Sequence, residues 1–449
     1  MPVTPEKTMT APPLDVQRQA PRRVLLAGTI GNTLEFYDFI VYGAIAALVF
    51  GPLFFPDASP FAGTLLALST FAAGFLARPV GALIFGALGD RIGRKRTLTL
   101  TLMLMGVSTV LIGCLPTFDQ VGVLAPLALV ILRIIQGAAI GGEWGGAVIF
   151  LGEHAGTARR GRATSFAQLG SPAGTLLANA VVLILISMTT DEQFLAWGWR
   201  IPFLLSALLV AVGIYTRLKV EETPVFKAIS DEARQHKIPV VDLLQSSWRR
   251  LLLALGITVI IFASYYTFTT VALAHLRLAG MPSEVGLYGT VIGSAIGLPV
   301  ILLVGPASDR FGRKPVFLSS LALIAVLSPF FFTMLDSGNF AAGVTAVALG
   351  MIAWCVGYGV YGAWLTELFP ARVRYTGVSL SYQVIGALAG TLPVIALGLS
   401  GEGTNTTPIM LILLGAVLVS LVAAVIAPET SGRKVLAKQS QDASIGGAA

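Results

Sequence analysis

Charged residues and cysteines are both scarce in this sequence. Only 12% of its 449 residues are charged and 55% are hydrophobic, whereas a soluble domain carries about 25% charged residues. This composition indicates that water is not the main solvent of the chain. The two cysteines, Cys114 and Cys355, both lie in apolar segments, so neither a disulfide framework nor a metal site is expected.

Motifs of ATP-driven and catalytic proteins are also absent. The sequence contains no phosphate-binding Gly-x-x-x-x-Gly-Lys-Ser/Thr loop, no His-Glu-x-x-His zinc motif and no nucleophile elbow. We therefore expect neither ATP drive nor an enzyme. The formal net charge of +7 comes from basic residues spread over short loops, and this scatter argues against nucleic-acid binding.

Long apolar runs dominate the sequence instead. They are too long and too uniformly apolar for the strands of a membrane β-barrel, which are about 10 residues long with alternating polarity, and most are long enough for membrane-spanning helices. The sequence therefore predicts an all-α, polytopic membrane protein. The twelve predicted spans cover residues 24–50, 61–89, 97–115, 121–150, 163–188, 199–218, 251–278, 284–305, 315–335, 340–366, 377–400 and 407–427.

The distribution of basic residues predicts the topology. Of the 30 lysines and arginines, all but Arg78, Arg133, Arg200 and Arg277 fall in the two tails and the even-numbered connections. Because short cytoplasmic loops collect basic residues, both termini are expected in the cytoplasm of a cell inner-membrane protein. The predicted regions are an N-terminal tail (1–23), a six-helix bundle (24–218), a polar central loop (219–250), a second bundle (251–427) and a C-terminal tail (428–449).

Two polar motifs recur in the two halves. The motif after span two contains Gly86, Asp90, Arg91, Gly93 and Arg94, and the motif after span eight contains Gly305, Asp309, Arg310, Gly312 and Arg313. Asp90 and Asp309 are 219 residues apart, and Glu153 and Glu367, each before a basic loop, are 214 residues apart. Two motifs at nearly one offset indicate two homologous six-helix halves.

These motifs, with Arg133 to Gly137 in span four, resemble the signatures of the major facilitator superfamily. Segments 31–43, 75–81, 141–146 and 197–203 resemble the metabolite:proton symporter family, and they are most similar to its shikimate-transporter-like branch. The resemblance implies twelve transmembrane helices in two pseudo-symmetric six-helix bundles, working by alternating access. It also implies proton-coupled uptake of a small organic anion, such as a shikimate-like, aromatic or dicarboxylic acid.

Two other functions stay open at this stage. Betaine and citrate carriers share much of the same pattern, so a betaine or other zwitterion symporter is the first alternative, although the short tail after Pro428 shows no heptad repeat. A transporter-like membrane sensor is the second. We expect no cofactor besides protons as the coupling ion, the lipid bilayer as surroundings, and a functional monomer.

Ionisable residues inside the spans are the first candidates for function, because burying a charge in a membrane costs about 2.5–3.5 kcal/mol even on a lenient scale. Glu35 and Asp38 lie near the middle of span one and share a helix face by their spacing. Asp38 is the first candidate for proton coupling and Glu35 the second. Arg78, which has room to snorkel towards the cytoplasm, and Glu143 are left without an assigned role.

Arg133 is the predicted anion-binding residue, because a guanidinium can bind a carboxylate through two hydrogen bonds. An anionic substrate would compete with the acid of span one for Arg133, so proton and substrate binding would favour each other. Polar rows in spans one, four, five, seven, ten and eleven supply further candidates. Helix packing is the alternative role of any single hydroxyl in them, whereas the tyrosines and Trp354 are better candidates for a cavity that binds an organic ring or chain. The predicted substrate-binding residues are Asn32, Tyr42, Arg133, Gln136, Gln168, Tyr265, Tyr358 and Tyr361.

The recurring motifs are expected to act as gates. Asp90 and Asp309 lie where a loop meets a helix, with basic residues close by in the sequence, and such charge pairs can hold one conformation and release in the other. Glu153 and Glu367 are assigned to the same gating set. Orienting the protein in the membrane is a second role that the basic residues of these loops serve in any case.

Overall fold

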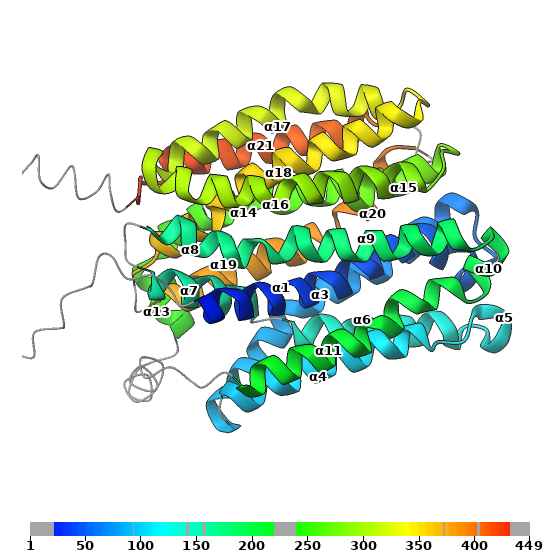
Figure 1. Cartoon of the computed structure of the whole chain (residues 1–449), viewed down its shortest axis with the longest axis horizontal. Coiled ribbons are helices and arrows are strands. Elements are labelled where there is room, and N and C mark those ends of the chain that lie inside the picture. Colours follow the sequence, from blue (N-terminus) through cyan, green and yellow to red (C-terminus); the bar gives the residue numbers. More distant parts are fainter. Residues whose placement is uncertain are drawn as a thin grey trace, which may run out of the picture.

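The computed structural model describes residues 22–92, 94–140, 143–155, 159–219, 239–370, 373–401 and 405–431. All regular elements in these ranges are helical, and Figure 1 shows them running lengthwise through an elongated molecule. Helix α1 begins and helix α21 ends at the same end of the molecule (Figure 1). This placement fits an even number of spans.

The described helices of the first half run from α1 to α11. In chain order they are α1 (Arg22–Ile45), η1 (Ala46–Phe50), α2 (Gly51–Phe54), α3 (Pro60–Ile92), α4 (Arg94–Gly113), α5 (Phe118–Val121), α6 (Leu124–Ala139), α7 (Glu143–His154), α8 (Arg160–Gln168), α9 (Gly170–Met188), α10 (Asp191–Ala196), η3 (Gly198–Arg200) and α11 (Ile201–Lys219).

The second half repeats the pattern of long helices. Its elements are α13 (Pro239–Ser246), α14 (Trp248–Tyr266), η4 (Thr267–Val271), α15 (Ala272–Leu278), α16 (Glu284–Phe311), α17 (Arg313–Leu335), α18 (Phe340–Leu368), α19 (Arg374–Ala389), α20 (Leu392–Leu399) and α21 (Thr407–Ile426). Most of the predicted central loop, residues 220–238, lies outside the described residues.

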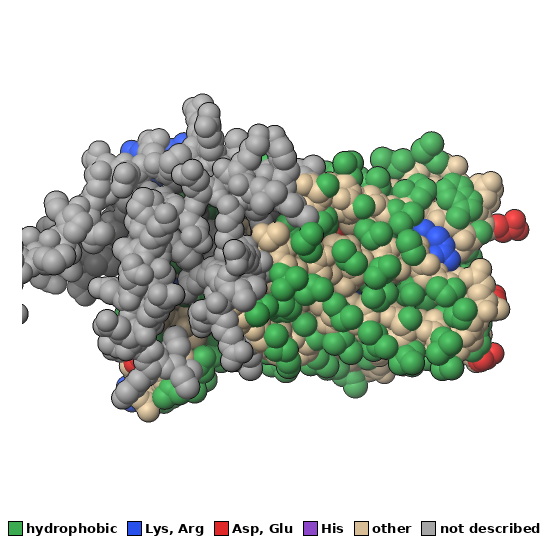
Figure 2. Space-filling model, turned by 90° about the horizontal axis from the view of Figure 1, so that it is seen from below, with side chains coloured by type: hydrophobic (Ala, Val, Ile, Leu, Met, Phe, Trp, Pro, Cys, Tyr) green, Lys and Arg blue, Asp and Glu red, His purple; other side chains and the backbone are tan. Residues whose placement is uncertain are grey.

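Helices occupy each of the twelve predicted ranges, so the all-α polytopic prediction is confirmed. Within the described residues, nine helices are long and apolar enough to cross a membrane, and Thr99–Gly113 and Leu124–Ala139 are shorter apolar helices. Figure 2 shows the consequence on one face, where hydrophobic side chains cover most of the described surface and acidic side chains gather at one end. Such a surface matches a lipid environment and not water.

The first and seventh spans share a local irregularity. Each contains one π-helical turn, η1 at Ala46–Phe50 and η4 at Thr267–Val271, and all residues of both turns are buried. A π turn adds a residue to the helix and shifts the side chains that follow. Gly43 and Thr270 show that these regions meet, because a Cβ at Gly43 would lie 3.3 Å from Thr270 Oγ1.

Small residues allow the two halves to approach closely. Helix α16 packs on α8 and α9, and α3 packs on α19 and α20. A Cβ at Gly161 would lie 2.5 Å from the carbonyl oxygen of Gly305, and one at Gly145 would lie 2.6 Å from Ser379 Oγ. Larger side chains there would push the halves apart, as is usual for small residues between membrane helices.

Candidate functional site

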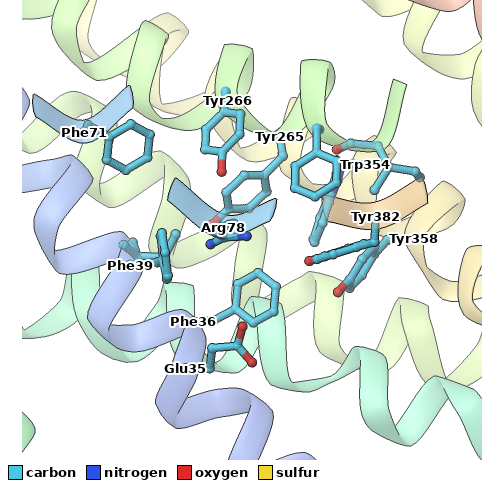
Figure 3. Close-up of a pocket in the computed structure, with 13 residues that line it drawn as sticks. Glu35, Phe36, Phe39, Phe71, Arg78, Tyr265, Tyr266, Trp354, Tyr358 and Tyr382 are labelled. Carbon is cyan, nitrogen blue, oxygen red and sulfur yellow. The ribbon is translucent and has the colours of Figure 1, made fainter. Parts of the chain in front are cut away.

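A narrow cavity of about 30 Å³ lies between the two halves. Helices α1 and α3 form one side of it, and helices α14, α18 and α19 form the other (Figure 3). The lining residues are Glu35, Phe36, Phe39, Ile40, Phe71, Arg78, Ile261, Phe262, Tyr265, Tyr266, Trp354, Tyr358 and Tyr382. Most of this lining is aromatic, and within the described part of the chain Glu35 and Arg78 are its two charged members.

Arg78 points into this cavity from α3 (Figure 3). Its side chain is only 4% exposed, and its guanidinium carbon lies 4.1 Å from the ring centre of Phe39 and 4.0 Å from that of Phe75. Its Nε is buried without a hydrogen-bond partner. The expectation that Arg78 could snorkel out of the membrane is therefore wrong, because the aromatic rings hold the cation inside the protein.

The structure separates the two carboxylates of α1. Glu35 lines the cavity and points towards it in Figure 3, whereas Asp38 is not among the lining residues. Although the two residues are one helical turn apart, three residues correspond to a rotation of about 300° around a helix with 3.6 residues per turn. The two side chains therefore point about 60° apart around the helix axis. Glu35 faces the cavity between the halves, whereas Asp38 faces the interior of the first half.

Asp38 belongs to a chain of buried hydrogen bonds that joins four helices of the first half. Ser206 Oγ donates to Asp38 Oδ1 (2.5 Å), and the Thr109 hydroxyl donates to Asp38 Oδ2 (3.1 Å). Gln136 Nε2 donates to Thr109 Oγ1 (2.8 Å), and Arg133 Nη1 donates to Gln136 Oε1 (2.6 Å). Arg133 and Asp38 are thus connected, as predicted, but through two neutral side chains.

Arg133 lies behind the wall of the cavity. It is fully buried, and its guanidinium carbon lies 4.1 Å from the ring centre of Tyr42, 4.6 Å from Phe39 and 5.0 Å from Phe71. Its Nε and Nη2 have no hydrogen-bond partner. A Cβ at Gly74 would lie 2.7 Å from Arg133 Nε, so this glycine leaves the room that the side chain occupies.

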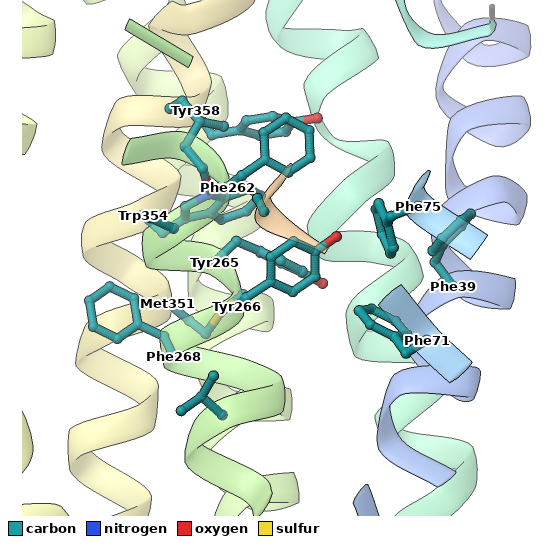
Figure 4. Packing of buried hydrophobic residues seen from close by; sticks show 14 of the residues in the cluster. Phe39, Phe71, Phe75, Phe262, Tyr265, Tyr266, Phe268, Met351, Trp354 and Tyr358 are labelled. Carbon is teal, nitrogen blue, oxygen red and sulfur yellow. Dashed lines mark hydrogen bonds between the residues drawn. The ribbon is translucent and has the colours of Figure 1, made fainter. Parts of the chain in front are cut away.

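Stacked aromatic rings of the second half form the opposite side of the cavity (Figures 3 and 4). Trp354 stacks on Tyr358 with ring centres 4.4 Å apart, and Tyr265 lies 4.9 Å from Trp354. Tyr382 stacks at 4.0 Å on Trp144, a residue of the first half. The wall therefore offers flat apolar faces to a ligand, and part of it is shared between the halves.

Four of the predicted binding residues lie away from the cavity and make packing contacts. Tyr42 shares a hydrogen bond with Thr70 (2.5 Å), and Tyr361 shares one with Thr258 (2.9 Å). Asn32 Nδ2 donates to the carbonyl oxygen of Ala167 (2.7 Å), and Gln168 Nε2 donates to that of Tyr358 (2.9 Å). Arg133 and Gln136 are likewise not among the residues that line the cavity. Tyr265 and Tyr358, the other two predicted binding residues, do line it.

Three further lining residues, Trp354, Tyr266 and Tyr382, belong to the polar rows of spans seven, ten and eleven. The tyrosines and tryptophan of these rows are candidates from the sequence for a cavity that binds an organic ring, although these three are not among the eight predicted substrate-binding residues. Phe36, Phe39 and Phe71 gave no signal, because phenylalanine is common throughout apolar spans and its position alone does not separate a cavity from lipid.

Beyond the cavity, charged residues join the halves at the end of the molecule where α16 ends. Arg313, fully buried, binds Asp309 (Nη2 to Oδ1, 2.8 Å) and Glu367 (Nη2 to Oε1, 3.1 Å). The Asp309 carboxylate also accepts hydrogen bonds from the backbone N–H groups of Gly161 and Arg162, both 2.9 Å, at the start of α8. The second-half motif therefore contacts the first half directly.

The remaining members of the gating set are described only in part. Gly305 packs closely against Gly161, Gly312 has a φ of 106°, and Arg310 is exposed. Gly93 and the side chains of Asp90, Arg91, Arg94, Glu143 and Glu153 lie outside the described residues, as does the burial of Gly86. In the described ranges, no group of His, Cys, Asp and Glu could hold a metal ion.

Comparison with known proteins gives consistent matches over most of the chain. The family model of the Major Facilitator Superfamily matches residues 28–391. The inner membrane metabolite transport protein YhjE of Escherichia coli (strain K12) is 41% identical over 384 residues, which cover 83% of this chain and 87% of that protein. The shikimate transporter of the same strain is 40% identical over 387 residues, covering 84% and 87% of the two chains.

A second substrate class occurs among the relatives. The proline/betaine transporter of Escherichia coli (strain K12) is 34% identical over 427 residues, which cover 92% of this chain and 84% of that protein. Among solved structures, the proton:xylose symporter XylE matches with a TM-score of 0.70 and 20% identity, covering 91% of this chain and 96% of that one. The structural match bears on the fold alone.

Proposed function

The chain belongs to the major facilitator superfamily, and we propose that it is a proton-coupled symporter that takes up a small organic anion. That it is a multi-pass membrane transporter of metabolites and not an enzyme follows from its family and relatives. The observation that carries the finer proposal is the buried guanidinium of Arg78, which points into a cavity between the halves. A cation buried among apolar rings favours an anionic ligand.

The lining of this narrow cavity suits a compact carboxylic acid, which would enter when the halves move apart. Its carboxylate would bind Arg78, and its carbon skeleton would pack on the rings of Trp354, Tyr358 and Tyr265. These rings offer apolar faces for a flat or cyclic body, and such contacts supply much of the affinity in small-molecule sites. A shikimate-like or aromatic monocarboxylate meets both requirements.

Two acids of α1 are the proposed proton carriers. Asp38, the first candidate from the sequence, is buried and linked to Arg133 through Thr109 and Gln136. Glu35, the second candidate, lines the cavity. Loss of a proton from either acid changes the charge near a buried arginine. Protonation of that acid would therefore change the affinity of the site for an anion.

The Asp309 cluster is the proposed gate. Asp309, Arg313 and Glu367 hold each other within the second half, and Asp309 binds the first turn of α8 in the first half. Opening the cavity at this end requires these contacts between the halves to break. In this proposal the gate faces the cytoplasm of the inner-membrane protein, with both termini on the same side.

A zwitterion symporter is the second candidate function. Glu35 lies in the same aromatic cavity as Arg78, and an aromatic cage next to an acid can bind a quaternary ammonium group. Betaine would then place its carboxylate at Arg78 and its cation among the rings. The two candidate functions differ in the substrate that is transported, so a transport assay with both classes of substrate separates them.

Uptake by purified protein in lipid vesicles provides this test. We expect accumulation of shikimate or benzoate when a pH gradient, acidic outside, is imposed, and no accumulation when the gradient is collapsed with a protonophore. Betaine and proline serve as zwitterionic competitors. Accumulation of betaine but of neither acid would contradict the anion proposal, and proton-independent binding without transport would favour a sensor.

A further inference from the structure

We propose that Gly386 is a specificity-determining residue of the anion site, because its missing side chain leaves the space beside Arg78 in which the substrate carboxylate binds. This inference rests on the proposed function, in which a carboxylate binds Arg78, and it places that carboxylate at the boundary between the halves. It is drawn from the way in which helix α19 of the second half approaches Arg78 of the first half.

Gly386 lies on the side of α19 that faces the cavity and α3. It is buried, and it is four residues from both Tyr382 and Gly390, so the three residues share one face of the helix. Tyr382 lines the cavity (Figure 3), and Gly390 packs on Phe75 of α3. Gly386 therefore lies where the cavity wall continues into the contact between the halves.

A side chain at Gly386 would meet two residues that line the cavity. A Cβ atom there would lie 3.2 Å from Phe262 Cζ and 3.8 Å from Arg78 Nη1. A methyl group would thus be in van der Waals contact with a terminal nitrogen of the guanidinium. A carboxylate oxygen that accepts a charge-assisted hydrogen bond lies about 2.7–2.9 Å from such a nitrogen, so the methyl group and the carboxylate would compete for the same side of Arg78.

Gly386 and Gly390 differ in what they make room for. At Gly390 the space is filled by protein, because a Cβ atom would lie only 2.3 Å from the Cβ atom of Phe75. At Gly386 the nearest contact of 3.2 Å requires Phe262 to move by only a few tenths of an ångström. Alanine is a better helix former than glycine, so neither close packing nor helix formation explains the glycine here. Room for a ligand beside Arg78 does explain it.

A carboxylate in this position would contact both halves at once. It would bind the guanidinium of Arg78 on α3 and lie against α19 and the ring of Phe262 on α14. The first half then supplies the charge that attracts the acid, and the second half supplies the space that admits it. A methyl group at Gly386 should therefore remove the preference for an acid and leave the ring contacts on Trp354 in place.

The test is equilibrium binding of labelled shikimate to full-length protein purified in detergent, with benzoate and benzamide as competitors. Gly386→Ala should weaken binding of both acids about tenfold, because a hydrogen bond to a charged group is lost. Binding of neutral benzamide should change less than about twofold, so the preference for the acid over the amide falls.

Gly152→Ala is the matched control. Gly152 of α7 is a buried glycine near both halves, and a Cβ atom there would lie 3.4 Å from Thr164 Cγ2 and 3.9 Å from Thr366 Oγ1. None of these three residues lines the cavity. We expect the affinities for all three probes to stay within about twofold of the wild-type values in this variant.

Arg78→Gln separates a role at Arg78 from a general loss of packing. If the methyl group displaces the carboxylate from Arg78, adding Gly386→Ala to Arg78→Gln should not lower the affinity further, so the two changes are not additive. Additive losses, or an affinity of Gly386→Ala within twofold of the wild type, would overturn the inference.

Thermal melting of each preparation shows whether the alanine disturbs folding. If it does, or if Arg78→Gln binds too weakly to measure, a structure of the wild-type protein with benzoate decides, and a carboxylate bound away from Arg78 and α19 would overturn the inference. Wild-type protein that binds neither acid would instead overturn the proposed function. Unchanged binding of both acids by Gly386→Ala would leave that function standing.

Discussion

The two halves of this transporter share a fold but present different chemistry to one cavity. Among the described residues, the first half supplies Glu35 and Arg78, whereas the second half lines its side with Ile261, Phe262 and five tyrosine or tryptophan side chains and no charged residue. The two halves thus share a pattern of long helices, while the described residues that face the cavity differ. Among the described lining residues, only the first half has charge to stabilise at the cavity.

The first half meets that requirement with its own interior. Its hydrogen-bond chain from Ser206 to Arg133 joins helices α11, α1, α4 and α6, and the rings of Phe39 and Phe75 hold Arg78. At the cavity, the described residues of the second half place no such demand on it, and in the proposed function they match a substrate by shape. If the proposed function holds, charge recognition and shape recognition are assigned to different bundles.

The sharpest way to break this comparison is to change the arginines of the first half. Arg78→Lys should weaken binding of a monocarboxylate about 10- to 100-fold, because a charge-assisted hydrogen bond contributes about 1.5–3 kcal/mol and lysine loses the bidentate geometry. Equilibrium binding of labelled shikimate to detergent-purified protein measures the change.

Arg133→Lys is the matched control for that experiment. Because Arg133 lies behind Phe39 and Tyr42, we expect it to lower thermal stability and transport rate while substrate affinity stays within about threefold. The sequence alone predicted the reverse, with Arg133 as the anion ligand. Equal losses of affinity in the two variants would show that the rings of Phe39 and Tyr42 do not keep Arg133 apart from the substrate.

A second prediction concerns the contact between the halves at the gate. Asp309→Asn should lower the transport rate about tenfold with little change in substrate affinity, since losing about 1.4 kcal/mol from one conformation changes its population tenfold. Asp309 lies away from the cavity and binds Arg313 and the start of α8. Initial rates and binding constants of the same preparation give both quantities.

Asp90→Asn tests whether the gate is shared by both halves, because Asp90 holds the corresponding place in the repeated motif. The side chain of Asp90 lies outside the described residues, so its role stays a prediction from the sequence. An unchanged rate in a normally expressed Asp309→Asn protein would contradict the gate in the second half, whatever Asp90→Asn does.

The sequence was sufficient to predict the spans, because apolar runs of this length have few alternatives in a membrane protein. It also singled out Glu35, Asp38, Arg78 and Arg133, since each charge interrupts an apolar run and is costly there. The choice between Arg78 and Arg133 required the structure. Both residues face protein, and the lipid-facing and protein-facing sides of such helices are equally apolar, so periodicity cannot give the helix rotation.

Aromatic residues were harder to assign for a related reason. Tyr361 and Tyr358 are three residues apart on α18, yet Tyr358 lines the cavity while Tyr361 bonds to Thr258. Each tyrosine has an apolar ring and one polar atom, so the sequence does not reveal whether the hydroxyl meets a ligand or a neighbouring helix. The first half presents the same ambiguity at Tyr42, which bonds to Thr70.

A third prediction probes shape recognition in the second half. Trp354→Leu should weaken binding of a ring-containing acid about fivefold, because a buried aromatic contact contributes about 0.5–1.5 kcal/mol beyond its area, while acetate as a ringless probe should bind as before. Trp354 stacks on Tyr358 and lies against Tyr265. Competition binding with benzoate and acetate measures the difference, and equal losses for both acids would contradict shape recognition.

The smallest predicted effect comes from a hydroxyl shared by the two halves. Tyr358 OH accepts a hydrogen bond from Trp144 Nε1 at 3.1 Å, and Gln168 Oε1 accepts from the same N–H at 3.1 Å. Tyr358→Phe keeps the ring on the cavity wall and leaves Gln168 to satisfy the indole. Since a neutral hydrogen bond contributes only about 0.5–1.5 kcal/mol and one acceptor remains, we expect affinity and rate to change less than about twofold.

Removing both acceptors should have a larger effect than the sum of the single changes. The double variant Tyr358→Phe with Gln168→Leu leaves the buried Trp144 N–H without either acceptor, and an unsatisfied buried donor costs about 1–3 kcal/mol. Transport rates of the two single variants and the double variant form a thermodynamic cycle. Strict additivity would show that this contact between the halves does not depend on the shared indole, and that aromatic stacking alone joins Trp144 to the second half.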